Sequence, residues 1–426
     1  MKTFMLGWEF PPFISGGLGT ACYGLTKAMD KLGINVVFVL PKSCAEHQSG
    51  SVKIISAEDF PGSGVFGGFK NVRFRTIVSP LKPYANAGSY QRFISSKFSK
   101  MNKGSNVNPA QIKDMSNYGG DMYSEVCRYA DKAAKIAATE EFDIIHAHDW
   151  MTYPAGVVVS KLSGKPLVVH VHSTEFDRSG ENINQMIYDI EWQGMHAAEK
   201  VIAVSNYTKN IIIRHYGIPS EKVEVIYNAV EYEDSKVAEA VPAKSGKIVL
   251  FLGRITMQKG PEYFLAAAKK VLEVINNVKF IMAGDGDMKH RIINLAAQLG
   301  IGHKVLFTGF LRGADVDRVY QMADLYVMPS VSEPFGIAPL EAMRRNVPVL
   351  ISKHSGISEV LLHALKVDFW DINEMANKIV AVLKRPPLQM TLSKNGFSET
   401  HKFRWEDSAL KVKRVYEATL ASVGIN

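Results

Sequence analysis

Short runs of apolar residues alternate along most of the chain with longer segments in which apolar residues recur every three to four positions. In the first half the apolar runs are TFML, INVVFVL, VRFRTIV, FDIIHA, PLVVHVH and KVIAVS, followed by VEVIYNAV. Helical spacing separates several of them, at residues 20–32, 121–140, 184–199 and 206–216. This alternation predicts buried parallel strands joined by crossover helices.

The same alternation begins again in the second half of the chain. The runs KIVLFLG, VKFIMAG, HKVLFTG, DLYVMPS and VPVLIS form a second series of predicted strands with helices between them. At 426 residues the chain is also too long for one ordinary hydrophobic core. We therefore expect an α/β protein with two doubly wound, Rossmann-like domains.

One polar, alanine-rich and proline-containing stretch, residues 232–246, is the predicted linker. It places an N-terminal domain at residues 1–232 and a C-terminal domain at residues 233–405. The final segment, residues 406–426, has helical spacing and follows the last predicted strand. We expect this segment to be a helix that crosses back to the N-terminal domain.

Composition narrows the class of protein. Hydrophobic residues make up 46% of the chain and charged residues 22%, which is typical of a soluble globular protein. The N-terminal MKTFMLGWEF reaches Trp8 and Glu9 before a signal-peptide core could form, so a cytoplasmic location is expected. Cys22, Cys44 and Cys127 are an odd number at scattered spacings, which predicts reduced thiols.

Positive charge is concentrated in one window. The formal net charge is +8, and residues 61–120 hold nine Lys or Arg against one acid, 9 − 1 = +8. Such a window could attract nucleic acid, anionic lipid or a phosphorylated ligand. Because no nucleic-acid-binding motif accompanies it, we interpret it as a solvated surface insertion and expect no nucleic-acid partner.

A glycine-rich turn, in EFPPFISGGLG, follows the first predicted strand and precedes a helix. Gly16, Gly17 and Gly19 lack Cβ atoms, so backbone N–H groups can approach an anion at the helix N-terminus. A turn required only for packing explains the glycines equally well. No Gly-Lys-Ser/Thr follows, which disfavours a P-loop.

Histidines gather at the ends of two predicted strands, in FDIIHAHDW and VVHVHSTEF. The first strand supplies His146, His148 and Asp149, and the second supplies His170 and His172. A metal site could be drawn from these residues, but for His146 and His170 we favour buried structural histidines. His148 and His172 come later on each strand, where they can face a cleft and donate to hydroxyls or phosphate.

Two cations lie in one loop of the second series. In GRITMQKG, Arg254 follows a strand and Lys259 precedes a helix, so both can neutralise a diphosphate through charge-assisted hydrogen bonds. The alternative is a pair of ordinary solvated charges. Asp285 and Asp287, in AGDGDM, could suggest magnesium, but acidic loops are common at strand ends and we assign no metal.

Two carboxylates occur in SVSEPFGIAPLEAM, with Glu333 on a loop and Glu341 on the helix that follows. Carboxylate oxygens at fixed places can accept hydrogen bonds from sugar hydroxyls and from a ribose diol. A glycosidase would need both carboxylates to flank one glycosidic bond. Nothing else in the sequence gives a glycosidase context, so sugar and ribose binding is the preferred interpretation.

The segments PPFISGGLG, HAHDW, GRITMQKG and EPFGIAPLEAM, in this order, resemble the retaining glycosyltransferases of the GT-B fold. The resemblance covers nearly the whole chain and is to the glycosyltransferase 4 and glycogen (starch) synthase group. HAHDW and VHSTEFDRSG are most similar to the glycogen synthase branch. The resemblance thus implies a hexosyltransferase that moves glucose from a nucleotide-glucose to an α-1,4-glucan in glycogen biosynthesis.

Other functions stay open beside this one. Within the same fold, the acceptor could be lipid-linked or a small molecule, in which case the basic window would be a membrane-surface patch. A nucleotide-sugar epimerase shares the GT-B architecture but needs no acceptor. A noncatalytic protein that binds glucan or nucleotide is the remaining alternative.

Matching positions in the motifs carry the family's site residues onto this sequence. The resemblance implies no cofactor and no bound metal, because two cations replace Mg²⁺. The residues are Gly16 and Gly17 for the phosphate and transferred sugar, His148 for a sugar hydroxyl, Arg254 and Lys259 for the diphosphate, Glu333 with the backbone of Phe335, Gly336 and Ile337 for the donor sugar, Glu341 for the ribose, and Asp149 and His172 as candidate acceptor or sugar contacts.

The resemblance also implies retention of anomeric configuration by same-face attack, with Glu333 as a positioning residue and not a nucleophile. One departure concerns the donor. Bacterial ADP-glucose-dependent glycogen synthases usually carry Lys-x-Gly-Gly, whereas Ile14 and Ser15 precede Gly16 and Gly17 here. The donor base is therefore open between UDP-glucose, ADP-glucose and another nucleotide sugar.

Overall fold

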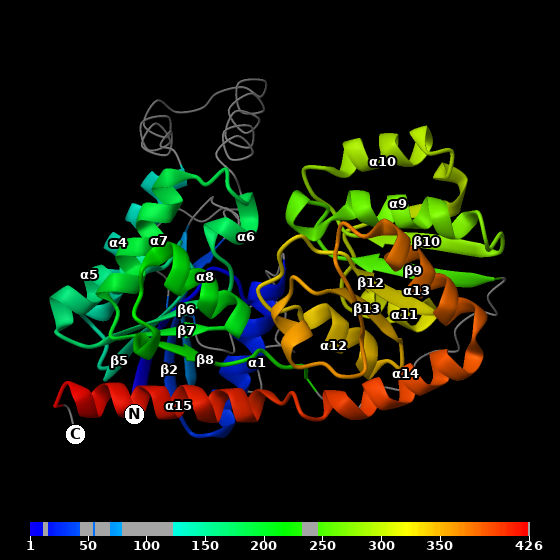
Figure 1. Ribbon diagram of the computed structural model, residues 1–426. Helices are drawn as coiled ribbons and strands as arrows, with labels where there is room; N and C mark the ends of the chain where they lie inside the picture. The colour runs from blue at the N-terminus through cyan, green and yellow to red at the C-terminus, as the bar shows by residue number, and fades with distance from the viewer. Residues whose placement is uncertain (12–15, 43–53, 56–68, 79–121, 232–245, 425–426) are drawn as a thin grey trace, which may run out of the picture. The chain divides into compact units, whose positions relative to one another are not determined.

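The computed structural model describes residues 1–11, 16–42, 54–55, 69–78, 122–231 and 246–424, which contain two mostly parallel sheets flanked by helices (Figure 1). The chain divides into two compact units. The first comprises Met1–Val171, Asp189–Ile202 and Val412–Asn426, and the second comprises His172–Tyr188 and Ala203–Lys411. These units follow packing and not sequence order, so the domain boundaries expected from the sequence stay a prediction.

Eight strands form the first sheet, in the order β3-β4-β2-β1-β5-β6-β7-β8. Because β1 pairs in parallel with both β2 and β5, the direction in which the sheet grows reverses between them. The short β3 pairs with β4 in the antiparallel direction. The strands are β1 (Lys2–Leu6), β2 (Asn35–Lys42), β3 (Ile54–Ile55), β4 (Val72–Val78), β5 (Ile144–His148), β6 (Leu167–Val171), β7 (Lys200–Ala203) and β8 (Val223–Val225).

Helices predicted at residues 20–32, 121–140, 184–199 and 206–216 are confirmed as α1, α4, α7 and α8. Local signals explain several ends. The Ser205 side chain caps the N-terminus of α8, and a left-handed Gly217 ends it. The helical segments of this half are α1 (Gly17–Lys31), α4 (Met122–Ala137), α5 (Tyr153–Ser163), α6 (Glu175–Ser179), α7 (Gln185–Ala197), α8 (Asn206–Tyr216) and η1 (Ser220–Lys222).

Six parallel strands form the second sheet, in the order β11-β10-β9-β12-β13-β14, so its direction of growth reverses between β9 and β12. The strands are β9 (Lys247–Leu252), β10 (Val278–Ala283), β11 (Val305–Gly309), β12 (Leu325–Met328), β13 (Val349–Ser352) and β14 (Leu365–Val367). The helical segments are η2 (Met257–Lys259), α9 (Pro261–Leu272), α10 (Lys289–Gln298), η3 (Gly302–Lys304), α11 (Ala314–Met322), α12 (Ile337–Arg344), η4 (Gly356–Glu359), α13 (Ile372–Lys384) and α14 (Pro386–Thr400).

The strands β5, β6, β12 and β13 are buried at every position, which is why they appear in the sequence as largely apolar runs and not as alternating patterns. All five strands predicted for the second half are present, and the α/β doubly wound class is confirmed. The core of the second unit lies between its sheet and helices such as α9 and α13. The additional strands β3 and β14 have two and three residues, too few to produce a recognisable run.

The last helix, α15 (Trp405–Ser422), contributes to both units. Before Lys411 it belongs to the second unit, where the Ser408 hydroxyl donates to the Tyr227 carbonyl at 2.8 Å. From Val412 onward it belongs to the first unit. Among the described residues, no helix combines the length and the apolar character needed to span a bilayer.

Candidate active site

Two adjacent strands of the second sheet, β9 and β12, end beside each other, and each is followed by a loop that carries predicted site residues. The loop after β9 holds Arg254 and Lys259, and the loop after β12 holds Glu333. Open α/β sheets bind ligands at the carboxyl ends of the strands where the direction of growth reverses. The topology therefore brings together the cations and the carboxylate that the sequence singled out.

Lys259 and Glu333 are in direct contact. The Lys259 Nζ lies 2.5 Å from Glu333 Oε2, and the Ser330 hydroxyl donates to the same oxygen at 3.3 Å. The side chains of Lys259 and Glu333 are only 20% and 9% exposed. Because water screens this pair far less than a surface pair, the interaction is stronger and its geometry is better defined.

Backbone hydrogen bonds also fix Glu333. Its N–H donates to the His354 carbonyl at 3.0 Å, and its carbonyl accepts from the Gly356 N–H at 2.9 Å. These bonds join the loop after β12 to the segment after β13, so the carboxylate projects from a braced turn.

Gly260 allows the Lys259 loop to pack against the end of β12. Its φ is +64°, and a Cβ at this position would lie 2.1 Å from the Pro329 carbonyl oxygen. A side chain is therefore excluded both by the left-handed conformation and by contact with backbone. The glycine of GRITMQKG thus has a packing role that also sets the place of Lys259.

A buried glutamine links Arg254 to the second loop. The Arg254 Nη2 donates to Gln258 Oε1 at 3.2 Å, and the Gln258 carbonyl accepts from the Val331 N–H at 2.9 Å. The sequence analysis did not single out Gln258. Its buried position between two charged residues of the same loop is visible only in three dimensions.

The helix α12 begins at Gly336, whose φ is +104°. Phe335 is buried before this turn, and Ile337 is the first residue of the helix. Within the described part of the chain, no side chain caps this N-terminus. The backbone N–H groups at this helix N-terminus favour the binding of an anion or a sugar oxygen.

Glu341, one turn further along α12, accepts a hydrogen bond from the Tyr320 hydroxyl at 3.0 Å. Burial raises the pKa of Glu341, while the Arg345 charge and the Tyr320 hydrogen bond oppose that rise. A carboxylate held in this way has acceptor capacity beyond the bond from Tyr320. The ribose contact assigned to Glu341 stays a prediction.

Two segments from the first half of the sequence hold the loop at residues 330–336. The Ser332 hydroxyl donates to Asp177 Oδ1 at 2.6 Å and lies 3.0 Å from the Tyr207 hydroxyl. The Pro334 carbonyl accepts from the hydroxyls of Ser205, at 2.6 Å, and Thr208, at 3.2 Å.

The sequence pattern did not predict these contacts, although VHSTEFDRSG is similar to glycogen synthases. The spacing of Thr174 and Asp177 indicates a capping box and says nothing of a distant partner.

In the first unit, the glycine turn leads into α1. Gly16 is its N-cap in an extended conformation, and a Cβ on Gly17 would meet no atom within 4 Å. The Gly19 N–H donates at 3.0 Å to the carboxylate of Glu9, which is fully buried. Glu9 is thus a further functional candidate that the sequence analysis did not identify. Ile14 and Ser15 lie outside the described residues.

Three histidines of the first unit share one face of the sheet. Residues two apart on a strand point the same way, and His148 on β5 is paired in register with His170 on β6. The His146 Nδ1 lies 2.5 Å from the Tyr416 hydroxyl of α15. All three histidines are buried, and His148 has no exposed surface. The sugar contact assigned to His148 stays a prediction.

Asp149 follows β5 directly in a left-handed conformation, with φ of +59°. It is buried, and its N–H donates to the His170 carbonyl at 3.0 Å. Non-glycine residues in this conformation are uncommon and occur often at functional turns. The structure therefore places Asp149 at a constrained turn, and its predicted sugar contact stays a prediction.

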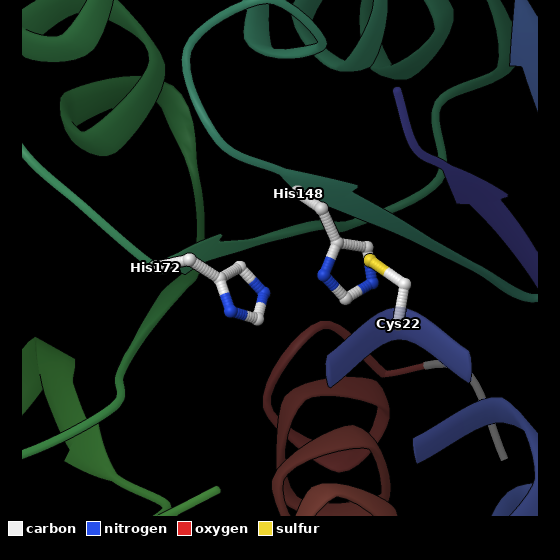
Figure 2. A group of neighbouring side chains, drawn as sticks. All are labelled: Cys22, His148 and His172. Atoms are coloured by element: carbon white, nitrogen blue, oxygen red, sulfur yellow. The ribbon is translucent and has the colours of Figure 1, made fainter. Parts of the chain in front are cut away.

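Cys22 of α1 and His148 of β5 are neighbours in the first unit (Figure 2). Burial, followed by the charges of Asp149 and Glu9, raises the pKa of the Cys22 thiol well above its ordinary value. His172, also drawn in Figure 2, follows β6 and is the first residue of the second unit. Burial lowers the pKa of His172 to about 3, so this ring is neutral at neutral pH.

The ring nitrogens of His146, His148 and His170 come within 4.8 Å of one another, which raises the question of a metal. In a tetrahedral site the in-plane lone pairs must converge on one point. The His146 and His170 rings are stacked, with an interplanar angle of 5°, so their in-plane lone pairs lie in two nearly parallel planes. This geometry fits a buried stack better than a metal site. We assign no metal, and independence from metal stays a prediction.

Of the nine cations in the basic window, two lie on the described β4. Arg73 and Arg75 both pair with Glu140, the first at 2.9 Å. They therefore have structural partners within the first unit. Most of residues 61–120, and Cys44, lie outside the described residues, as does nearly all of the linker predicted at 232–246. Cys22 and Cys127 carry free thiols.

Comparisons with known families and proteins are consistent with a fold of two Rossmann-like domains. Residues 102–234 match the family model described as Glycosyltransferase Family 4, and residues 233–399 match the one described as Glycosyl transferases group 1. An uncharacterized glycosyltransferase of Methanocaldococcus jannaschii is 28% identical over 100% of both chains. A glycogen synthase of Mycobacterium tuberculosis is 23% identical over 98% of this chain and 95% of its own length.

Among solved structures, sucrose-phosphate synthase from Thermosynechococcus elongatus superposes with a TM-score of 0.73 at 20% identity, covering 99% of this chain and 100% of that one. At this identity the likeness shows the fold. Together with the family matches, it shows that the chain carries a glycosyltransferase family 4 domain followed by a glycosyltransferase group 1 domain, and that it is a glycosyltransferase of the GT-B fold.

Proposed function

We propose that the protein is a retaining glycosyltransferase that moves glucose from a nucleotide-glucose to the nonreducing end of an α-1,4-glucan. The observation that carries this proposal is the shielded contact between Lys259 and Glu333 at the point where the second sheet reverses its growth. This contact supports a site in which Lys259 neutralises a diphosphate and the neighbouring Glu333 carboxylate holds the transferred sugar. The glycogen synthase relative, which matches along almost its whole length, supports glucose and glucan as the substrates.

The leaving group is the nucleoside diphosphate, whose negative charge grows as the glycosidic bond breaks. Arg254 and Lys259 stabilise that charge through charge-assisted hydrogen bonds. Gln258 holds the guanidinium and Glu333 holds the ammonium, so both cations are oriented before the reaction. Because these two charges neutralise the diphosphate, the reaction needs no divalent metal.

The acceptor hydroxyl forms its new bond to the anomeric carbon on the face from which the diphosphate departs. A departing phosphate oxygen takes the hydroxyl proton, so the products are the extended glucan and the nucleoside diphosphate. Glu333 keeps its contact with Lys259 and orients the donor sugar through hydrogen bonds, without forming a covalent intermediate. Glu341 holds the ribose by accepting hydrogen bonds from its hydroxyls, in addition to the bond that it accepts from Tyr320.

The remaining assignments follow the motifs. The backbone of Phe335, Gly336 and Ile337 lies at the N-terminus of α12, where N–H groups stabilise sugar and phosphate oxygens. Gly16 and Gly17 act at the N-terminus of α1 on the same principle. His148, Asp149 and His172 are proposed as sugar or acceptor contacts.

Incubation with glucose-labelled UDP-glucose and ADP-glucose, with and without glycogen, tests the proposal. Label that enters polymer only when glycogen is present supports it, and the preferred nucleotide identifies the donor base. A new free sugar nucleotide would identify an epimerase instead, and an unchanged donor would identify a noncatalytic protein. Activity that survives EDTA would agree with metal-free transfer.

The acceptor is tested separately against the lipid-linked alternative. Sedimentation with vesicles that contain anionic lipid should leave the protein in the supernatant if glucan is the acceptor. Co-sedimentation together with transfer to a lipid-linked acceptor, and none to glycogen, would replace glucan as the acceptor while keeping the transferase.

A further inference from the structure

We propose that Asp177 is a positioning residue for Glu333 and that it acts through the hydroxyl of Ser332. The inference rests on the proposed function only in taking Glu333 to be the residue that holds the donor sugar. Asp177 comes from the first half of the sequence, 155 positions before Ser332, and both residues lie in the second compact unit.

Asp177 is fixed before it reaches Ser332. It is the third residue of α6, and its Oδ2 accepts hydrogen bonds from the Thr174 N–H at 2.7 Å and the Thr174 hydroxyl at 2.8 Å. The other oxygen, Oδ1, accepts from Ser332 at 2.6 Å. With 1% of its surface exposed, the carboxylate has little contact with water. A carboxylate held by three donors in this way forms strong, well-directed hydrogen bonds.

Tyr207, Ser332 and Asp177 form a chain of hydrogen bonds in which each hydroxyl donates to the next residue. A serine hydroxyl has one proton, and Ser332 gives it to the Asp177 carboxylate. The contact of 3.0 Å with Tyr207 is therefore made by the tyrosine proton on the Ser332 oxygen. Ser332 is thus held on both its donor and its acceptor sides, and it immediately precedes Glu333.

The residue after Glu333 is held independently. The Pro334 carbonyl accepts from Ser205 at 2.6 Å and from Thr208 at 3.2 Å, both near the N-terminus of α8. Glu333 therefore lies between two anchored positions, one on each side. The Asp177 side chain holds Ser332 from outside the loop, so substitution of Asp177 removes this anchor without changing the sequence of the loop at 330–336.

Loss of this anchor should change the reaction rate and the hold on the donor sugar more than it changes the binding of glycogen. The Lys259 contact keeps the Glu333 carboxylate near the site, but the loop carrying it gains freedom, and small displacements of a positioned group reduce the rate of the chemical step. Asp177→Asn substitutes an N–H₂ for one oxygen of the carboxylate and removes its charge. We expect kcat for transfer to fall about ten- to a hundredfold, with KM for glycogen unchanged within about twofold.

The same helix provides a matched control. Glu175 is as buried as Asp177, at 2%, and its carboxylate is bonded within its own segment to Arg178, Ser179 and Asn184. Glu175→Gln therefore disturbs hydrogen bonds within this segment while the bond between Ser332 and Asp177 stays in place. If α6 matters only as a folded element, the two variants will lose activity together.

The experiment compares Asp177→Asn, Ser332→Ala, their double variant and Glu175→Gln in the full chain. The expected result is a similar fall in kcat for the two single variants, no further fall in the double variant, and near-normal kcat for Glu175→Gln. Ser332→Thr, which keeps the hydroxyl, should retain most of the activity lost in Ser332→Ala. Additive losses in the double variant, or an equal loss in Glu175→Gln, would overturn the proposal.

Donor binding separates this inference from the proposed function. For each variant, calorimetry gives the affinity for UDP and for UDP-glucose, or for ADP and ADP-glucose if wild type prefers them. The affinity for the nucleotide sugar divided by the affinity for the free nucleotide reports the contribution of the sugar alone. Asp177→Asn and Ser332→Ala should reduce that ratio and Glu175→Gln should not, whether or not glycogen is the acceptor. If wild type transfers nothing, the proposed function fails, and an unchanged ratio in Asp177→Asn would reject the positioning role as well.

Discussion

Replacing Lys259 by alanine removes a charge that the structure connects to two different quantities, the reaction rate and the stability of the fold. In the reaction, the ammonium would stabilise the departing diphosphate. In the folded protein, it pairs at 2.5 Å with Glu333, whose side chain is only 9% exposed. The two effects can be predicted separately because they depend on different partners.

The effect on the rate should be large. Removing one preorganised group that stabilises developing negative charge costs about 10²- to 10³-fold in kcat. The effect on stability should be smaller. Glu333 loses its cation but keeps the hydrogen bond from Ser330 at 3.3 Å, so unfolding free energy should fall by about 1–3 kcal/mol.

A second substitution separates the two quantities. Glu333→Gln replaces the carboxylate with a neutral amide, so the double variant no longer has a shielded negative charge without its cation. In denaturant unfolding, Lys259→Ala/Glu333→Gln should therefore be more stable than Lys259→Ala alone. Its turnover should stay at least as low as that of Lys259→Ala, because the diphosphate still has no ammonium.

Initial rates of glucose transfer at saturating donor and glycogen provide the assay. Lys289→Ala is the control, because Lys289 lies 3.5 Å from Asp285 in a partly exposed pair that has no predicted site role. Turnover near the wild-type value in Lys259→Ala would remove Lys259 from the mechanism. Recovery of turnover in the double variant would show that the damage came from the unbalanced Glu333 and not from the leaving group.

Three further predictions concern pH, backbone and buried polar contacts. Burial raises the pKa of Glu341 above 4.5 in the folded protein, so the donor KM should rise as pH falls through that raised pKa. Glu341→Gln should abolish this rise. The stabilisation of the fold linked to this carboxyl is present at low pH and is lost as pH rises through the folded pKa. A pH-independent donor KM in wild type would refute the ribose role. Gly260→Ala should destabilise the protein by more than the roughly 1–2 kcal/mol expected from its left-handed backbone, because of the clash with a carbonyl oxygen; Gly217→Ala, with a similar φ and open space around it, is the control for denaturant unfolding, and equal losses would contradict the clash. Tyr416→Phe removes the buried bond to His146 and should cost about 1 kcal/mol in the same assay, whereas unchanged stability would show that the bond contributes nothing net.

The fold could be predicted from the sequence because of a specific physical property of parallel sheets. Strands covered by helices on both faces are apolar at most positions, so runs such as KIVLFLG and VKFIMAG stand out from amphipathic helices. Where an element is too short to form such a run, as in β3 and β14, the pattern contains no signal. The division of the chain into compact units could not be predicted, because packing between segments distant in sequence decides it.

The candidate site was predictable to the extent that topology determines it. Arg254, Lys259 and Glu333 each follow a strand that the sequence predicts, but only the structure shows that β9 and β12 are neighbours. The bond between Asp177 and Ser332 could not be found from the sequence, because no periodicity connects α6 with a loop about 155 residues later. Strand alternation placed the histidines on one face but could not show that His148 has no exposed surface.

The contacts around Glu333 also bear on how the two family matches share the work. The group 1 match covers residues 233–399 and contains Glu333, whereas Asp177, Ser205 and Tyr207 lie in the family 4 match at residues 102–234. Hydrogen bonds at Ser332 and Pro334 join these two parts of the sequence on either side of the carboxylate. The proposed donor site is therefore not a property of the group 1 match alone, since its central loop derives its order from residues that precede that match. Substitutions at these earlier positions should alter the binding of the donor sugar even though the sequence assigns them to the predicted N-terminal domain.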